Sequence, residues 1–374
     1  MFGGPRPDNS ESLILSDTIL NPHWEELANA LQLIGCIDVL YLANVQLDER
    51  TLQRIEESVR QKGITKFDLT ENGFGGGEGA QFAIDVLKSN RSVEDFRWDT
   101  NSFHSTEDVY KLVDAVLEHP AIRRLYLVDS LNEDIAAIKR LFGGVGTDTL
   151  LNVDVSFNDI KTNGDRCIPV FLSKNPQLER LILRGNHLTD DDALHIVQAL
   201  KSNTNLRYLD LGCNDVSNEG RAGVYMLAVL GSSLSDPSDL KSFRKPTLIG
   251  VSVANHTCEI HGIFGKMITN VEDESEDWNT KIFLNNNGKS ARWNRGGKLF
   301  WLHAARHHQG SNVSRLESEF SGDGMGLVPH VFACINTCST YWKRTDFTVR
   351  CNLSVLFELV RDWKGPEMYQ FHQA

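Results

Sequence analysis

Apolar residues recur through the first two thirds of the chain in one fixed order, apolar-x-x-apolar-x-apolar-x-x-Asn-x-apolar. The clearest copy is Leu178, Leu181, Leu183, Asn186 and Leu188. The same frame begins at residues 10, 37, 64, 93, 122, 150, 178 and 206, so consecutive copies lie 27 to 29 residues apart. A constant period of this length is typical of repeat architectures, in which each unit packs only against its neighbours.

Within each copy the pattern predicts a short strand followed by a helix. Alternate side chains of a strand point to opposite faces, so Leu181 and Leu183 would point into the repeat. The residues after the strand have helical spacing, since Leu194, Val197 and Leu200 recur at i, i+3 and i+6. We therefore expect a parallel sheet on the inner, concave side and helices on the outer side.

The asparagine of the frame would enter the turn after the strand, where its amide can bond backbone groups of adjacent repeats that water cannot reach. Leaving such a group unpaired costs about 1–3 kcal/mol. The copy that begins at Ile122 has Ser130 at this position. The predicted structural ladder consists of Asn72, Asn101, Asn158, Asn186 and Asn214.

The period weakens after the eighth copy. A degenerate ninth copy begins at Leu248, with Val251 and Val253, after an insertion near 231–247. Helical spacing then predicts helices over 298–307, 328–341 and 351–363. Because an open solenoid end exposes an apolar face, residues 261–374 are expected to form a mostly helical cap. The chain would then comprise a flexible N-terminus (1–9), a repeat domain (10–260) and this cap.

The length of the unit and its full helix, as in residues 178–200, resemble the ribonuclease-inhibitor-like class of leucine-rich repeat. This resemblance covers residues 10–260. It implies an α/β fold, a right-handed leucine-rich-repeat solenoid or horseshoe. It implies no single function, because the class includes inhibitors, immune-receptor sensor domains and Ran GTPase-activating proteins. Segments 254–258, 327–329 and 356–361 are similar to the ends of leucine-rich-repeat proteins from microalgae, which implies no activity either.

Charge and composition narrow the choice of partner and compartment. The formal net charge of −12 argues against nucleic-acid binding, which needs clustered Lys and Arg. The chain starts without a basic segment followed by an apolar one, and no apolar stretch approaches the ~20 residues that span a bilayer. Its seven cysteines are scattered, as is typical of reduced thiols. We expect a cytoplasmic or nuclear protein without membrane contact.

Outward-pointing strand positions would form the concave face. Tyr and Arg are enriched at binding hot spots. Any solenoid must place side chains there, however, and mixed charge is the ordinary choice for a solvated face. Both interpretations stay open for the candidate partner-binding residues, which are Tyr41, Lys66, Asp68, Asp95, Arg97, Arg124, Tyr126, Asp154, Arg180, Ile182, Tyr208 and Asp210.

Two glycine-rich stretches resemble phosphate loops but favour repeat turns. Gly73–Gly79 would lie between a strand and a helix, yet it lacks a Lys-Ser/Thr pair, and Glu78 would repel phosphate. Phe142–Thr147 lacks the lysine as well.

One histidine and two cysteines share a helical face, namely His330, Cys334 and Cys338. With His307 or His308 they could bind zinc. Structural zinc sites use tighter pairs such as Cys-x-x-Cys, so a packed helix is favoured. No arrangement of nucleophile, His and Asp can be recognised in the sequence either. We expect no enzymatic activity, no metal and no cofactor.

The favoured function is a non-enzymatic interaction module or scaffold, monomeric in isolation, that binds an unidentified protein on its concave face. The alternative is a GTPase-activating protein of the Ran activator type. The acidic run Glu272–Asp277 is only six residues long and precedes an apolar cap, whereas those activators end in a free acidic tail. A third hypothesis is the sensor part of an immune receptor, but no nucleotide-binding domain accompanies the repeats.

Overall fold

The computed structural model describes residues 14, 19–74, 77–131, 133–144, 146–228, 247–263, 285, 289–308 and 319. The chain divides into two compact units, the first formed by Met1–Asp192 with Tyr208–Asp215 and the second by Ala193–Arg207 with Val216–Ala374. Several predictions lie outside the described residues: the N-terminus 1–9, residues 10–13 and 15–18 of the first copy, most of the insertion, the acidic run 272–277, and the helices 328–341 and 351–363. The predicted domain boundaries stay predictions.

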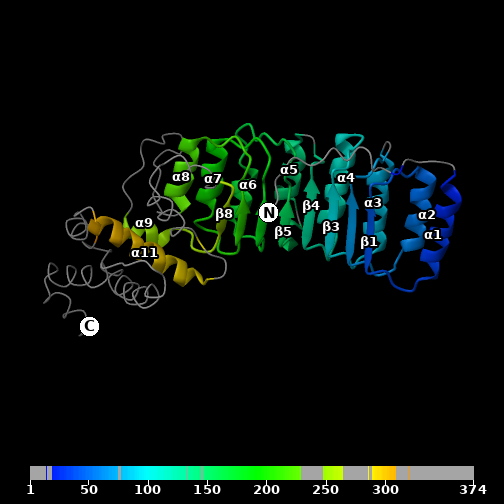
Figure 1. The fold of residues 1–374 in the computed structure, drawn as a ribbon, viewed down its shortest axis with the longest axis horizontal. Coiled ribbons are helices and arrows are strands. Elements are labelled where there is room, and N and C mark those ends of the chain that lie inside the picture. The colour runs from blue at the N-terminus through cyan, green and yellow to red at the C-terminus, as the bar shows by residue number, and fades with distance from the viewer. Residues whose placement is uncertain are drawn as a thin grey trace. The chain divides into compact units, whose positions relative to one another are not determined.

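Strands and helices alternate along the first unit (Figure 1). Each strand pairs in parallel with the next one in the sequence. The strands are β1 (Val39–Ala43), β2 (Lys66–Thr70), β3 (Asp95–Asp99), β4 (Arg124–Val128), β5 (Asn152–Asp154), β6 (Arg180–Ile182) and β7 (Tyr208–Asp210).

The helices of this unit contact one another in sequence order and cover one face of the sheet (Figure 1). They are α1 (Asn21–Leu33), α2 (Glu49–Val59), α3 (Glu78–Ser89), α4 (Thr106–Leu117), α5 (Ile135–Gly143) and α6 (Cys167–Ser173), with a 3₁₀ helix, η2 (Thr147–Thr149), after α5. Helix α7 (Asp190–Ala199) begins at the end of the unit. The predicted α/β solenoid of parallel strands and outer helices is confirmed.

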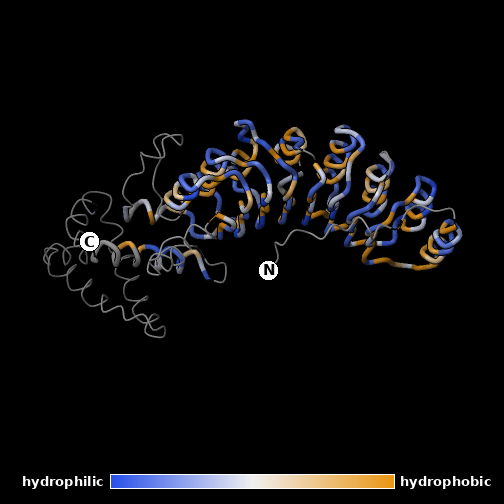
Figure 2. Tube along the Cα trace, turned by 45° about the horizontal axis from the view of Figure 1, so that its top comes forward, coloured by the Kyte–Doolittle hydropathy of each residue, from blue (hydrophilic) through white to orange (hydrophobic). Residues whose placement is uncertain are grey.

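The core lies between the sheet and the helices. The strand register aligns one buried apolar side chain from each strand, and the ring of Phe67 packs against Phe96 at 5.5 Å and against Phe82 of α3 at 6.0 Å. In Figure 2 the helices carry both hydrophobic and hydrophilic segments, as one-sided burial requires. The aligned row is Leu40, Phe67, Phe96, Leu125, Val153, Leu181 and Leu209.

Buried asparagine side chains join each repeat to the one before it. Asn158 Oδ1 accepts hydrogen bonds from the backbone N–H groups of Ser130 and Leu131, both at 2.7 Å. Its Nδ2 donates to the carbonyls of Leu127 (2.7 Å) and Ser156 (3.2 Å). Asn72, Asn101, Asn186 and Asn214 likewise donate to a carbonyl in or directly after the strand of the preceding repeat and accept from the backbone of that repeat. The hydroxyl of Ser130 donates in place of an amide.

A second set of buried asparagines, which the sequence frame does not include, performs the same task at the other end of the helices. Asn90 Nδ2 donates to the carbonyl of Val59 (3.1 Å), and its Oδ1 accepts from the N–H of Lys62 (3.1 Å). In the second unit, Asn255 Nδ2 donates to the carbonyls of Leu200 and Asn203, both at 2.9 Å.

The chain turns out of every strand of the first unit through one residue in the left-handed region. In the first six of these turns the N–H of this residue donates to the next repeat, as from Glu71 to the carbonyl of Asp99 (2.8 Å). A side chain in this conformation costs about 1 kcal/mol, and only one of the seven positions is glycine. At Gly185 a Cβ would lie 2.4 Å from the ring of Phe157. The seven residues are Asn44, Glu71, Thr100, Asp129, Phe157, Gly185 and Cys213.

In the second unit, the prediction of a ninth copy whose strand begins after Leu248 is wrong. Leu248–Val253 is a helix, α9, and the strand β8 spans Glu259–His261. The Thr247 hydroxyl caps α9 by accepting from the N–H of Gly250 (2.9 Å). Asn255 Oδ1 accepts from the N–H groups of Thr257 and Cys258 and so leads the chain into the strand. A short apolar run cannot be assigned to strand or helix from its spacing alone.

Helix α11 (Ala291–His308), which contains the predicted segment 298–307, brings a buried lysine into this unit. The side chain of Lys298 is only 1% exposed. Its Nζ donates to the carbonyl of Asn255 (2.9 Å) and to that of Ala228 (3.5 Å), the last residue of α8 (Asn218–Ala228). Burial lowers the pKa of Lys298 to about 7. Burial and the nearby Lys298 charge lower the pKa of His256 to about 3.

Replacing Asn158 by Ala should lower the free energy of unfolding by about 2–4 kcal/mol, because four buried backbone groups lose their partner. Urea titration of both forms measures the change. The matched variant Asn152→Ala removes an amide that lies half-exposed on the sheet, and it should change stability by less than about 0.5 kcal/mol. Equal effects would contradict the bridging role.

Raising the pH from 7 to 8.5 should stabilise the second unit by up to about 2 kcal/mol. The unfolded chain keeps a proton on Lys298 up to its ordinary pKa of 10.5, whereas the folded chain loses it near 7. The window ends below 9 because burial raises the pKa of Cys258 above its ordinary value of 9.0, so at higher pH this thiol opposes the slope that Lys298 produces. Hydrogen exchange of α8 and α11 reports the change. Lys298→Met should abolish the dependence, and a parallel slope in that variant would contradict this assignment.

Candidate functional site

The candidate site is the sheet face opposite the helices, for which we keep the name concave face. The strand register aligns the outward side chains in rows, of which two contain the candidate residues. All the residues proposed from the sequence therefore lie on one face. The first row is Lys66, Asp95, Arg124, Asn152, Arg180 and Tyr208, and the second row is Tyr41, Asp68, Arg97, Tyr126, Asp154, Ile182 and Asp210.

Opposite charges alternate along the first part of both rows and neutralise one another. In the first row, Arg124 Nε lies 3.0 Å from an oxygen of Asp95. In the second row, Arg97 Nε lies 3.5 Å from Asp68, and its Nη1 lies 3.4 Å from Asp99. Each cation thus has a neighbouring carboxylate in the free protein. The concave face consequently offers little uncompensated charge around β2 to β4.

Two arginines of this face stack on tyrosines of the next strand. The guanidinium carbon of Arg97 lies 4.2 Å from the centre of the Tyr126 ring, and that of Arg180 lies 3.7 Å from the Tyr208 ring. Such contacts contribute about 0.5–1 kcal/mol at exposed sites. They also hold both planar groups in fixed orientations. The face therefore presents stacked Arg and Tyr side chains, which are the residue types most common at binding hot spots.

The exposed fraction of each side chain separates residues that a partner could contact from residues that only hold their neighbours in place. Tyr41 is 59% exposed and Arg180 is exposed, so both are open to a partner. Asp68 is only 6% exposed, and it accepts a hydrogen bond from the Thr70 hydroxyl at 2.7 Å. Its carboxylate therefore positions Arg97 and is not available to contact a partner. Asp99, which the sequence analysis missed, has the same role; its spacing of two residues from Arg97 is the signal that could have found it.

Partial burial alters the protonation of two residues in the middle of the second row. It raises the pKa of the Asp154 carboxyl, although hydrogen bonds from the N–H and hydroxyl of Ser156 oppose the shift. Burial also raises the pKa of Tyr126, with a contribution from the negative charge of Asp95. A charged Asp154 in this setting is a cost to folding.

The glycines that resembled phosphate loops have packing reasons. A Cβ on Gly79 would lie 2.4 Å from the Phe74 ring. Gly146 has a φ of +103°, and a Cβ there would lie 2.1 Å from the carbonyl oxygen of Leu117. Both positions therefore need glycine in order to pack one repeat against its own turn or its neighbour.

Metal ligation has no support in the part of the chain that the structure describes, where no three His, Cys, Asp or Glu side chains gather closely enough to hold an ion. The candidate zinc ligands His330, Cys334 and Cys338 lie outside it, as do the side chains of His307 and His308. Among the described helices, none is both long and apolar enough to cross a bilayer.

Comparison with known protein families supports the repeat. The family described as Leucine Rich repeat matches residues 174–197 and 202–224, which include the strands β6 and β7. These two stretches match leucine-rich repeats, and the other strand–helix repeats of the first unit have the same arrangement. The search of curated proteins found no match. Leucine-rich repeats generally mediate protein–protein interactions and are typically non-enzymatic. The open sheet face described above is the surface that such repeats leave free.

Replacing Asp154 by Asn should raise the free energy of unfolding by about 1 kcal/mol at pH 7, because the buried charge disappears. Since its folded pKa is raised, wild-type stability falls as the pH rises above 3.8, and the variant lacks this loss. The gain should therefore shrink near pH 3.5. Urea titrations at both pH values test this. Asp210→Asn, at the end of the same row, is the control, and a gain that persists at low pH would contradict the electrostatic cause.

Proposed function

We propose that this protein is a non-enzymatic interaction module whose concave face binds one partner protein. The observation that carries the proposal is the pair of stacked Arg–Tyr contacts, Arg97 on Tyr126 and Arg180 on Tyr208. Tyrosine offers a large contact area with few rotatable bonds, and arginine adds several fixed donors. A surface ordered in this way before binding loses little side-chain entropy when a partner docks.

The charge arrangement indicates what kind of recognition this face supports. Because Arg97 and Arg124 already have carboxylate neighbours, a partner gains little from simple opposite charge there. Binding would depend on shape, on stacking against the tyrosines and on hydrogen bonds to the remaining donors. We also propose that Asp154 keeps its unfavourable charge for contact with the partner, since a neutral residue there would be less costly to the fold.

We propose as well that the repeats belong to the ribonuclease-inhibitor-like class. Helices α2, α3 and α4 have 11, 12 and 12 residues within units of 27 to 29 residues. A full helix takes up more width per repeat than a strand does, so the helical side of a stack is longer than the strand side. This difference favours a curved stack with the sheet on its inner side. The partner-binding residues and the monomeric state belong to this proposal as well.

The test is affinity capture from native lysate with a matched pair of double variants. Arg180→Ala with Tyr208→Ala removes a stacked pair from the concave face. Arg140→Ala with Tyr110→Ala removes a comparable pair from the outer helices, where the guanidinium lies 5.4 Å from the ring. A specific partner should be retained by wild type and by the outer variant, and lost at least about tenfold by the concave variant. Melting curves must show that both variants are folded.

Two results would contradict the proposal. Equal retention by the concave variant would show that the partner uses another surface. Faster phosphate release from GTP-loaded, Ran-class GTPases on adding the protein would instead support the activator alternative.

A further inference from the structure

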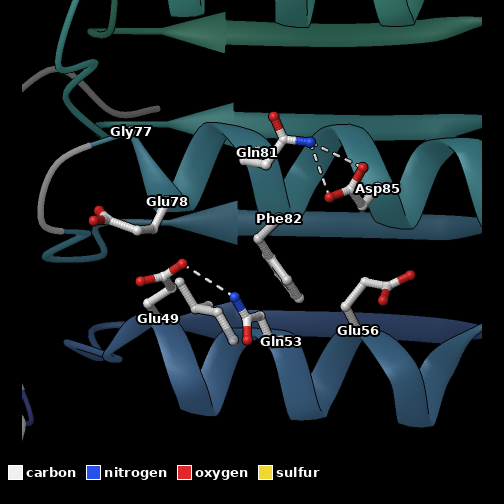
Figure 3. A pocket seen from close by; sticks show the side chains of 9 residues that line it. Glu49, Gln53, Glu56, Gly77, Glu78, Gln81, Phe82 and Asp85 are labelled. Atoms are coloured by element: carbon white, nitrogen blue, oxygen red, sulfur yellow. Dashed lines mark hydrogen bonds between the residues drawn. The ribbon is translucent and has the colours of Figure 1, made fainter.

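The outer helical surface contains a groove between α2 and α3 (Figure 3). Its volume is about 320 Å³. Leu52 of α2 and Phe82 of α3, which are 2% and 4% exposed, form its narrow apolar floor, and Glu49, Glu56, Glu78 and Asp85 stand at its sides. Among the nine residues that line it, all of them described, none is Lys, Arg or His. The groove thus combines an apolar centre with one sign of charge.

The charges of the groove are arranged in two groups around that centre. Figure 3 shows Glu49 and Glu78 near one end, Glu56 and Asp85 toward the other, and the ring of Phe82 between them. On α3, Glu78, Phe82 and Asp85 follow at i, i+4 and i+7, which places these three side chains along one face of the helix. Glu78 and Asp85 are therefore separated by roughly 10 Å along the axis.

Neutralisation in the groove is incomplete, in contrast to the concave face. Glu56, which is 8% exposed, is paired with Arg60, whose Nη2 lies 2.8 Å from its carboxylate. The amides of Gln53 and Gln81 donate to Glu49 (3.1 Å) and to Asp85 (2.9 Å), which orients these carboxylates without cancelling their charge. Glu78 Oε2 is shielded from solvent and has no hydrogen-bond partner among the described residues. A shielded carboxylate oxygen without a donor is costly, and a cationic donor placed beside the partly exposed Glu78 carboxylate would lower that cost.

We propose that this groove binds a basic amphipathic helix of a partner protein, with Arg or Lys at i and i+7 and an apolar residue at i+4. The i, i+7 spacing matches the separation of Glu78 and Asp85, and the apolar residue would meet Phe82 and Leu52. Helices that lie in grooves are commonly anchored by residues at such intervals. Charge complementarity selects a basic occupant, and the apolar floor selects a side chain over a free small cation. The site is separate from the concave face.

The test measures fluorescence anisotropy of a labelled, alanine-based helical peptide with Arg at i and i+7 and Leu at i+4. The variant Glu49→Gln, Glu78→Gln, Asp85→Asn removes three charges and little volume. The control Glu57→Gln, Glu107→Gln, Glu118→Gln removes the same number from exposed positions on or next to α2 and α4. Wild type and control should bind the peptide alike, and the groove variant should bind it at least about tenfold more weakly. Added salt should weaken the binding to wild type.

The proposal is overturned if wild type fails to bind the peptide or if the groove variant binds it as tightly as wild type. It also fails if a peptide with Gln in place of both Arg residues binds equally well. If the peptide with Ala at i+4 shows undiminished affinity, the apolar floor takes no part and the helix assignment is wrong. Binding by the Arg180→Ala, Tyr208→Ala variant should be unchanged, which separates this site from the concave face.

Discussion

The whole arrangement depends on buried amides that satisfy backbone groups across the boundary between two repeats. Asn158 and its counterparts each serve a donor and an acceptor of the preceding repeat, so a repeat cannot shift along its neighbour without leaving several buried groups unpaired. That constraint keeps every strand at the same height in the sheet. Equal height is what brings side chains such as Arg97 and Tyr126 into rows, and hence what makes a continuous surface from residues about 28 positions apart in the sequence.

The two surfaces of the solenoid use charge in opposite ways. On the concave face, cations and carboxylates of neighbouring strands neutralise one another, and stacking fixes the planar groups. A partner that docks there, as we propose, would be recognised by its shape. Between α2 and α3, carboxylates are oriented by glutamine amides, and Glu78 keeps one shielded oxygen without a donor. A basic partner would therefore gain more binding energy from electrostatic attraction on the outer side, where the lining of the groove contains no basic residue.

The apolar frame predicts the strands of the first unit because a two-residue alternation and a buried asparagine recur together in copies such as Leu178–Leu188. It also predicts which residues share the concave face, since the register follows from the repeat. It fails at Leu248, where a short apolar run fits a helix as well as a strand and the capping Thr247 decides. The groove could not be predicted, because the spacing of Glu78, Phe82 and Asp85 is also that of an ordinary solvated helix. The burial of Lys298 depends on contacts with residues some 40 to 70 positions away.

The left-handed residue after each strand has a consequence for how such a chain can change its length. In the first unit it always stands five positions after the first residue of its strand, from Asn44 after Val39 to Cys213 after Tyr208. The unequal lengths of the repeats are therefore accommodated entirely in the segment that contains the helix. An added or deleted residue within the strand and its turn would displace the bridging amide, whereas one on the helical side leaves it in place. Insertions that arise in evolution or by engineering should therefore be tolerated on the helical side. The length and register of the strands should stay the same while the helical segments vary.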